Sequence, residues 1–154
     1  MRLNFLCVML CLCICSVAEA RGRRGYSGSS SSSASQNAVV DKAPVYEVEV
    51  QLLEAVNTER KRFGLVALVL DPVLHLRARR HCGWMANAAS MVHSGDPSPE
   101  NIAMGQPDVP AVVNAWMNSS GHRANILNPN VTKIGLAGYR SPGGSVYWCQ
   151  QFGR

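Results

Sequence analysis

Apolar residues recur at helical spacing in two stretches of the chain, Val45–Phe63 and Pro72–Ser90. Each stretch places apolar side chains on one face every three to four residues and charged side chains mainly elsewhere, which is typical of amphipathic helices packed on a core. Gly64 follows the first stretch and predicts the end of that helix. Asp71 precedes the second stretch and predicts an N-cap, with Pro72 at the first helical position.

Further along the chain, the pattern changes from helical to strand-like. We expect a third helix at Val109–Asn118, followed by one short helical turn. Lys133–Arg140 and Ser145–Gly153 are β-prone and flank a Pro-Gly-Gly turn, which predicts an antiparallel hairpin. Two strands are only marginally stable alone, and Glu100–Met104 is the best candidate for a third. Helices first and strands last predict an α+β fold rather than an alternating parallel α/β fold.

The amino-terminal residues have the pattern of a segment that is removed during export. Arg2 precedes a short apolar run, Phe5–Val17, and the small residues of Ala18–Ala20 suit cleavage. This is typical of a secretory signal peptide, predicted at 1–20, and the apolar run is too short for a stable membrane span. A lipid anchor at Cys15 is the alternative. We therefore expect a secreted protein or one held in the cell envelope.

Composition changes sharply after the signal peptide. Residues 21–43 are rich in serine and cannot bury enough apolar surface to fold, so they predict a disordered linker before one domain at 44–154. The formal net charge of +5 suits either association with anionic cell-surface polymers or ordinary solubility. No basic patch interleaved with aromatic residues indicates a nucleic-acid partner. We expect a monomer with no transmembrane span after processing.

Loss of the signal peptide also changes the cysteine count, because only Cys82 and Cys149 remain. Two cysteines in an exported chain predict one disulfide bond. The enclosed loop is long, so an unstrained bond would stabilise the fold by about 3–5 kcal/mol. Two buried free thiols are the alternative.

Four motifs in order resemble one known family. They are the opening helices "NTERKRFGLVALVLDPVLHLRARRHCGWMA", the segment "VHSGDPSPENIAMG", the block "AVVNAWMNSSGHRANILNPNVTKIGLAG" and the closing strand "YWCQQFG". Together they resemble the CAP superfamily, which comprises cysteine-rich secretory proteins, antigen 5 and pathogenesis-related 1 proteins, in its bacterial-type variant. The family is also called the SCP-like extracellular domain. The resemblance covers about 52–153, nearly all of the predicted domain.

The resemblance implies a fold and a cleft. The fold is a three-layer α-β-α sandwich with a small central antiparallel sheet, and the cleft is lined in many members by two histidines and two glutamates. His93 and Glu100 match the first of each pair, and His122 matches the second histidine. The second glutamate should lie near Trp116, but Met117–Ser119 supplies no carboxylate there.

Two imidazoles and a carboxylate are a ligand set that could hold Zn²⁺ with water in the fourth position. His93, Glu100 and His122 are therefore the candidate metal ligands, and also the candidate catalytic residues of a metal-dependent hydrolase. Without the second carboxylate, however, a general base beside the metal is missing. The competing interpretation is a polar cluster held by hydrogen bonds, for example between His122 and Glu100.

The other polar candidates have simpler interpretations. Ser119 and Ser120 beside His122 suggest a hydrolase, but no Gly-x-Ser-x-Gly signature surrounds them, and a serine there can cap a short helix through its hydroxyl. We expect His75 at the surface. His81 lies close to the apolar face of its helix, and we expect it to be a core histidine with its hydrogen bonds satisfied.

These features favour a secreted, non-enzymatic binding module for a lipid, a cell-envelope component or a protein partner. Known members have diverse activities, so the fold does not select a function. The alternative function is a metal-dependent, protease-like hydrolase that uses the His93, Glu100 and His122 cleft.

Overall fold

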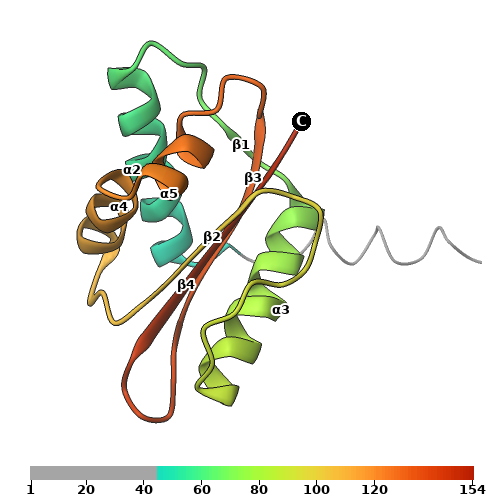
Figure 1. Cartoon of the computed structure of the whole chain (residues 1–154), viewed down its shortest axis with the longest axis vertical. Helices are drawn as coiled ribbons and strands as arrows, with labels where there is room; N and C mark the ends of the chain where they lie inside the picture. The colour runs from blue at the N-terminus through green and yellow to red at the C-terminus, as the bar shows by residue number, and fades with distance from the viewer. Residues whose placement is uncertain (1–44) are drawn as a thin grey trace, which may run out of the picture. The chain divides into compact units, whose positions relative to one another are not determined.

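A computed structural model describes residues 45–154 (Figure 1). The predicted signal peptide at 1–20, the predicted linker at 21–43 and the alternative lipid anchor at Cys15 lie outside the described residues. Within 45–154, no helix has both the length and the apolar character needed to span a bilayer.

The first described helix, α2 (Glu47–Arg62), lies where the apolar periodicity predicts it. Its amino end is capped by the Glu49 carboxylate, which accepts a 2.8 Å hydrogen bond from the backbone N–H of Tyr46. Gly64 ends the helix with a φ of 71°, a left-handed conformation that glycine adopts without steric cost. Phe63, expected on the buried face, is instead 48% exposed, because it follows the last helical residue and leaves that face.

Within the described part of the chain, four strands form a single sheet in the order β1-β3-β4-β2. Their bounds are β1 (Val69–Leu70), β2 (Glu100–Met104), β3 (Lys133–Arg140) and β4 (Val146–Gly153). The antiparallel pairing of β3 with β4 confirms the predicted hairpin, and the pairing of β2 with β4 confirms the predicted third strand. The connection before the second helix, expected only to be extended, adds β1 as a short parallel neighbour of β3.

Helix α3 (Pro72–Ala88) packs closely on this sheet. Asp71 caps it as predicted, accepting 2.9 Å hydrogen bonds from the backbone N–H groups of Val73 and Leu74. A side chain at Gly135 of β3 would place its Cβ only 2.0 Å from the carbonyl carbon of Leu74. The close approach of α3 to β3 therefore requires glycine at this position.

Helices cover both faces of the sheet (Figure 1). Helix α3 lies on one face, and α2, α4 (Val109–Met117) and α5 (Ser120–Ile126) lie on the other. Side chains alternate along β4, so that Trp148 joins the apolar cluster with α2 and α4 while Tyr147 and Cys149 join the cluster with α3. This arrangement confirms the three-layer α-β-α sandwich.

The predicted disulfide is not formed in this structure, where Cys82 and Cys149 are both buried free thiols. They belong to the same apolar cluster between α3 and the sheet. The Cys82 thiol donates to the backbone carbonyl of Tyr147, with the sulfur 3.1 Å from the oxygen. Burial raises the pKa of Cys82 to about 12, which disfavours the reactive thiolate in the folded domain.

Candidate functional site

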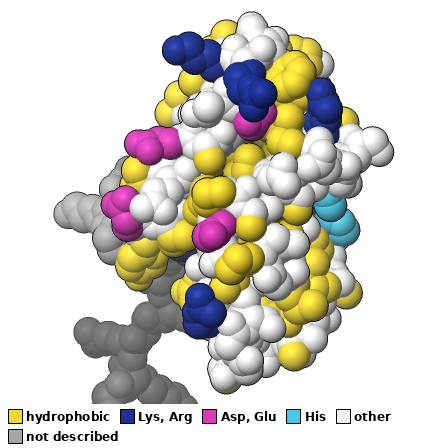
Figure 2. All heavy atoms as spheres, turned by 90° about the vertical axis from the view of Figure 1, so that its left-hand side faces the viewer, with side chains coloured by type: hydrophobic (Ala, Val, Ile, Leu, Met, Phe, Trp, Pro, Cys, Tyr) yellow, Lys and Arg dark blue, Asp and Glu magenta, His cyan; other side chains and the backbone are white. Residues whose placement is uncertain are grey.

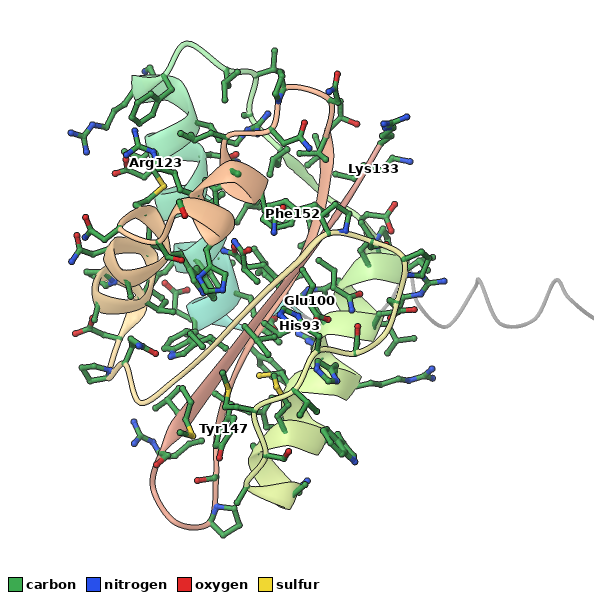
Figure 3. The ribbon with its side chains drawn as sticks, viewed as in Figure 1. His93, Glu100, Arg123, Lys133, Tyr147 and Phe152 are labelled. Atoms are coloured by element: carbon green, nitrogen blue, oxygen red, sulfur yellow. The ribbon has the colours of Figure 1, made fainter. Side chains whose placement is uncertain are left out.

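The candidate site is built around the carboxylate of Glu100, the first residue of β2 (Figure 3). His93 Nδ1 lies 2.8 Å from Glu100 Oε1, and the backbone N–H of Ser94 donates to the same oxygen at 3.0 Å. The other oxygen, Oε2, accepts a 2.9 Å hydrogen bond from Gln151 Nε2 on the adjacent strand β4. Both carboxylate oxygens therefore already have protein partners.

These partners decide the charge of Glu100, which is only 9% exposed. Burial alone raises the pKa of this carboxyl group, but the hydrogen bonds from Gln151, Ser94 and His93 outweigh it, and the pKa lies below its ordinary value. Glu100 is consequently an ionised acceptor at neutral pH.

His93 forms the exposed rim of the site, with 62% of its side chain accessible to solvent. Because Nδ1 faces Glu100, the other ring nitrogen, Nε2, is directed away from the carboxylate. A carboxylate that orients one nitrogen of an imidazole leaves the second nitrogen positioned for an external partner.

The third predicted residue, His122, is brought to the site by a buried polar network between α5 and β2. Asn101 Nδ2 donates to the His122 carbonyl at 3.0 Å, and Asn125 Nδ2 donates to Asn101 Oδ1 at 2.9 Å. Burial lowers the pKa of His122, and the charge of nearby His93 lowers it further. His122 is therefore neutral at neutral pH and is close enough to His93 to interact with it electrostatically.

The structure thus brings His93, Glu100 and His122 into one region from a loop, a strand and a short helix. Across residues 45–154, however, no three His, Cys, Asp or Glu side chains converge in an arrangement that could hold a metal ion. The three-ligand zinc site stays a prediction, and both oxygens of its carboxylate are engaged by hydrogen bonds.

Two residues that the sequence did not assign contact this region. Gln151 supplies the hydrogen bond to Glu100 described above. His81 Nε2 on α3 lies 2.8 Å from the Val92 carbonyl and 4.0 Å from Glu100 Oε1. The expectation that His81 has a satisfied hydrogen bond holds, but its ring lies at the edge of the site, stacked on Trp84 with centroids 5.8 Å apart.

Two expectations about polar side chains were wrong. His75 is buried, with 4% exposure, and its Nε2 lies 3.3 Å from Glu49 Oε2, because the close packing of α3 on β3 removes that turn from solvent. Ser119 occupies the N-cap position of α5, but its side chain makes no capping hydrogen bond.

The family assignment follows from a match over most of the domain. The family described as the cysteine-rich secretory protein family, or CAP, matches residues 53–152. The chain belongs to this family.

Relatives and solved structures agree with the family assignment. The Bacillus subtilis (strain 168) protein YkwD is 40% identical over 121 residues, which cover 68% of this chain and 46% of YkwD. This chain therefore spans about half the length of that relative. An outer surface protein of Borrelia burgdorferi has a similar fold, with a TM-score of 0.65 and 21% identity over 73% of this chain and 96% of that one.

An extracellular protein of Bacillus anthracis that contains an SCP domain also has this fold. Its TM-score is 0.61 and its identity 24%, over 73% of this chain and 45% of that one. At such identities these structures establish a shared CAP fold.

Proposed function

We propose that this CAP domain is an extracellular binding module without catalytic chemistry of its own, whose ligand binds at the His93 and His122 rim above Glu100. The observation that supports this proposal is the state of Glu100. Its oxygens accept hydrogen bonds from Ser94 and Gln151 and contact His93, and its pKa is lowered. An ionised carboxylate with these partners orients the His93 ring and places one negative charge beneath the rim.

The same observation counts against the alternative of a metal-dependent hydrolase. A general base is most effective when its pKa lies near the working pH and when it can reach the proton that it removes. Glu100 has a lowered pKa and is held by donors on both oxygens. The carboxyl end of α4, where a second glutamate was expected, carries Met117 and Asn118 instead.

The exposed location of His93 suits a partner that approaches from solvent. An exported protein meets lipids, cell-envelope components and other proteins, and these are the classes of ligand that we propose. Export is supported by the family and by the SCP-domain structure, which belongs to an extracellular protein.

Zinc binding is a second proposal, favoured by one specific contact. The Glu100 carboxylate beside His93 Nδ1 is the arrangement that orients a histidine whose other nitrogen binds a metal. His93 Nε2 and His122 would then be the ligands, with Glu100 orienting His93 rather than binding metal. When bound, Zn²⁺ would supply a Lewis acid at the rim.

The two proposals are tested with His93→Ala, His122→Ala and Glu100→Gln variants of the purified chain. NMR titration with lipid micelles, soluble envelope polysaccharide and candidate proteins should shift the amide signals of His93, Ser94 and His122. Shifts confined to another surface would contradict the proposed site. Turnover of a peptide or ester pool that Glu100→Gln abolishes would contradict the non-enzymatic assignment.

Zinc binding is measured separately by calorimetric titration with Zn²⁺ alone. We expect the His93→Ala and His122→Ala variants to lose the binding seen with the wild type, and Glu100→Gln to weaken it by roughly 10- to 100-fold, as expected for an orienting partner. Absence of specific binding, or binding that neither histidine variant changes, would rule out this metal site.

A further inference from the structure

The turn that follows α2 exposes an unusual set of apolar side chains. Val66 is 79% exposed, Val69 67% and Phe63 48%, and Val66 is the most exposed of the large hydrophobic residues within 45–154. They lie close together in the sequence, in the segment "KRFGLVALV" at 61–69. Three strongly exposed apolar side chains within seven consecutive residues, unlike single exposed ones, indicate an interaction surface.

The backbone beneath these side chains is firmly held. The buried side chain of Arg60 donates from Nε to the Val66 carbonyl at 2.8 Å, and the backbone N–H of Leu65 donates to the Arg60 carbonyl at 3.0 Å. The amide side chain of Asn57 both donates to and accepts from the backbone of Leu68, at 3.0 and 2.7 Å. The exposure of Val66 is therefore a feature of an ordered turn, since its backbone is fixed on both sides.

Cations flank this apolar turn. The guanidinium of Arg123 on α5 lies 5.0 Å from the centre of the Phe63 ring, and exposed Lys61 and Arg62 precede it in the chain. Figure 2 shows basic side chains interspersed with hydrophobic ones at the end of the domain where α2 terminates. The carboxylate of Glu59 forms a 3.0 Å ion pair with Arg62. We call Lys61, Arg62, Phe63, Val66, Val69 and Arg123 the α2 turn surface.

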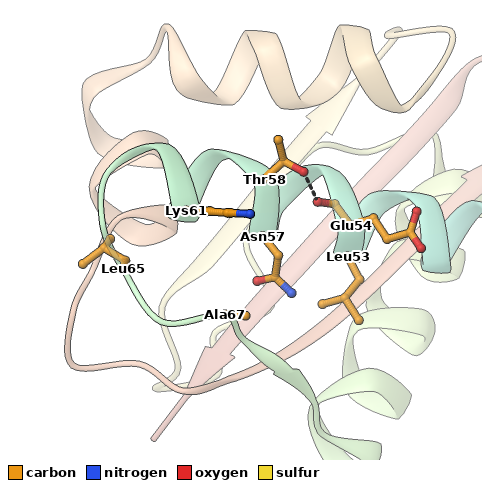
Figure 4. Close-up of a pocket in the computed structure, with 7 residues that line it drawn as sticks. All are labelled: Leu53, Glu54, Asn57, Thr58, Lys61, Leu65 and Ala67. Carbon is orange, nitrogen blue, oxygen red and sulfur yellow. Dashed lines mark hydrogen bonds between the residues drawn. The ribbon is translucent and has the colours of Figure 1, made fainter.

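A shallow depression of about 660 Å³ adjoins the turn (Figure 4). Leu53, Leu65 and Ala67 give it apolar walls, while Lys61 and Glu54 lie among its polar lining. The apolar surface thus continues from the turn towards α2. A soluble polyanion would bind through the cations alone. This surface also has apolar side chains and a hollow, which favour a ligand that has both anionic and apolar parts.

We propose that the α2 turn surface is a docking site for a bilayer that contains anionic phospholipid. Phe63, Val66 and Val69 would enter the boundary between headgroups and acyl chains, and Lys61, Arg62 and Arg123 would contact phosphates. The net charge of +5 favours approach to such a surface. These residues are distinct from His93, Glu100 and His122, so the docking site and the histidine site can fail independently.

The proposal is tested by co-sedimentation of the purified full chain with vesicles of phosphatidylglycerol and phosphatidylcholine, and with phosphatidylcholine vesicles alone. The wild type should sediment with the anionic vesicles. Replacing both Phe63→Ser and Val66→Ser should weaken that binding by about tenfold or more, because their apolar contribution is lost. The double change Arg62→Gln and Arg123→Gln should weaken it by a similar factor and reduce its salt dependence, because Lys61 is then the remaining cation of this surface.

Met104→Ser is the matched control, because Met104 is a large apolar side chain that is 46% exposed at the end of β2 and outside this surface. It should leave vesicle binding unchanged. Urea unfolding midpoints of all variants should match the wild type, since the substituted side chains are exposed. A Phe63→Trp variant gives a second readout, because lipids brominated on their acyl chains should quench its fluorescence if the ring enters the bilayer.

Three results would overturn the proposal. They are failure of the wild type to sediment with anionic vesicles, vesicle binding that the Phe63→Ser and Val66→Ser changes leave intact, and absence of quenching in the Phe63→Trp variant. Intact binding after those two changes would show that the vesicle affinity does not depend on these apolar side chains and would assign it to cations alone. Binding of a protein at the same surface, with no affinity for vesicles, would likewise replace the bilayer with a protein partner.

Discussion

Replacing Arg60 with methionine should destabilise this domain more than the same replacement of Arg62, an exposed arginine two residues further along the helix. Arg60 is 1% exposed, and its guanidinium joins three segments of the chain. It donates to the carbonyls of Val66 at 2.8 Å, Ile126 at 2.7 Å and Asn128 at 2.9 Å, and more weakly to Val131 at 3.4 Å. Methionine has a similar length and no donor, so the change removes these bonds while largely keeping the volume filled.

The magnitude follows from which carbonyls stay buried. The bonds to Ile126 and Val131 are buried, whereas those to Val66 and Asn128 are partly exposed and their carbonyls can turn to water. Each buried carbonyl left without a donor costs about 1–3 kcal/mol. Part of this cost is offset because burial of the guanidinium, which lowers the pKa of Arg60, is itself unfavourable. We expect the free energy of unfolding to fall by about 3 kcal/mol.

The assay is equilibrium urea unfolding, followed by circular dichroism and by tryptophan fluorescence. Arg62→Met is the matched control, because Arg62 belongs to the same helix and its side chain is 70% exposed. That variant should stay within about 0.5 kcal/mol of the wild type. An Arg60→Met protein as stable as Arg62→Met would refute the view that Arg60 holds the α2 turn to the loop after α5.

Three further predictions concern acid, thiols and packing. Burial alone raises the pKa of Glu49, but hydrogen bonds from Arg79 and the nearby His75 ring bring the pKa to about 2. The stabilisation by Glu49 is therefore present above the ordinary carboxyl pKa and is lost as the pH falls from about 4.5 to about 2. Glu49→Gln should flatten the dependence of the urea midpoint on pH in that window, and an unchanged slope would contradict this. In reduced protein, Cys82 and Cys149 should resist alkylation until urea unfolds the domain, because burial raises both pKa values; intact mass measures this. Alkylation of the unfolded protein without reductant tests the predicted disulfide. Alkylation of both cysteines would rule out that bond. Gly135→Ala should lower the free energy of unfolding by about 1–3 kcal/mol or more, because the added methyl group overpacks the contact of β3 with α3. Gly121→Ala is the control and should not lower it, because Gly121 has open space around it. Equal stabilities of the two variants would refute the close contact of α3 with β3.

The helices and strands could be predicted because their signals are local. Asp71 caps the helix that starts one residue later, and Gly64 stops the helix that ends two residues earlier. Glu100–Met104 could be predicted as a strand because a two-strand hairpin needs a third partner. The three site residues were found through motifs whose order resembles the CAP superfamily, not through any spacing that brings them together.

Local patterns and motifs were therefore enough to predict the order of the main helices and of strands β2, β3 and β4, the α+β class, and His93, Glu100 and His122 as candidate site residues. The state of these residues depends on long-range packing. Gln151 reaches Glu100 only because β4 pairs with β2 in one register, and a shift by one residue would turn it to the other face. The burial of His75, the parallel pairing of β1 and the exposure of Phe63 likewise depend on which surfaces meet, and contacts between residues far apart in the chain decide that.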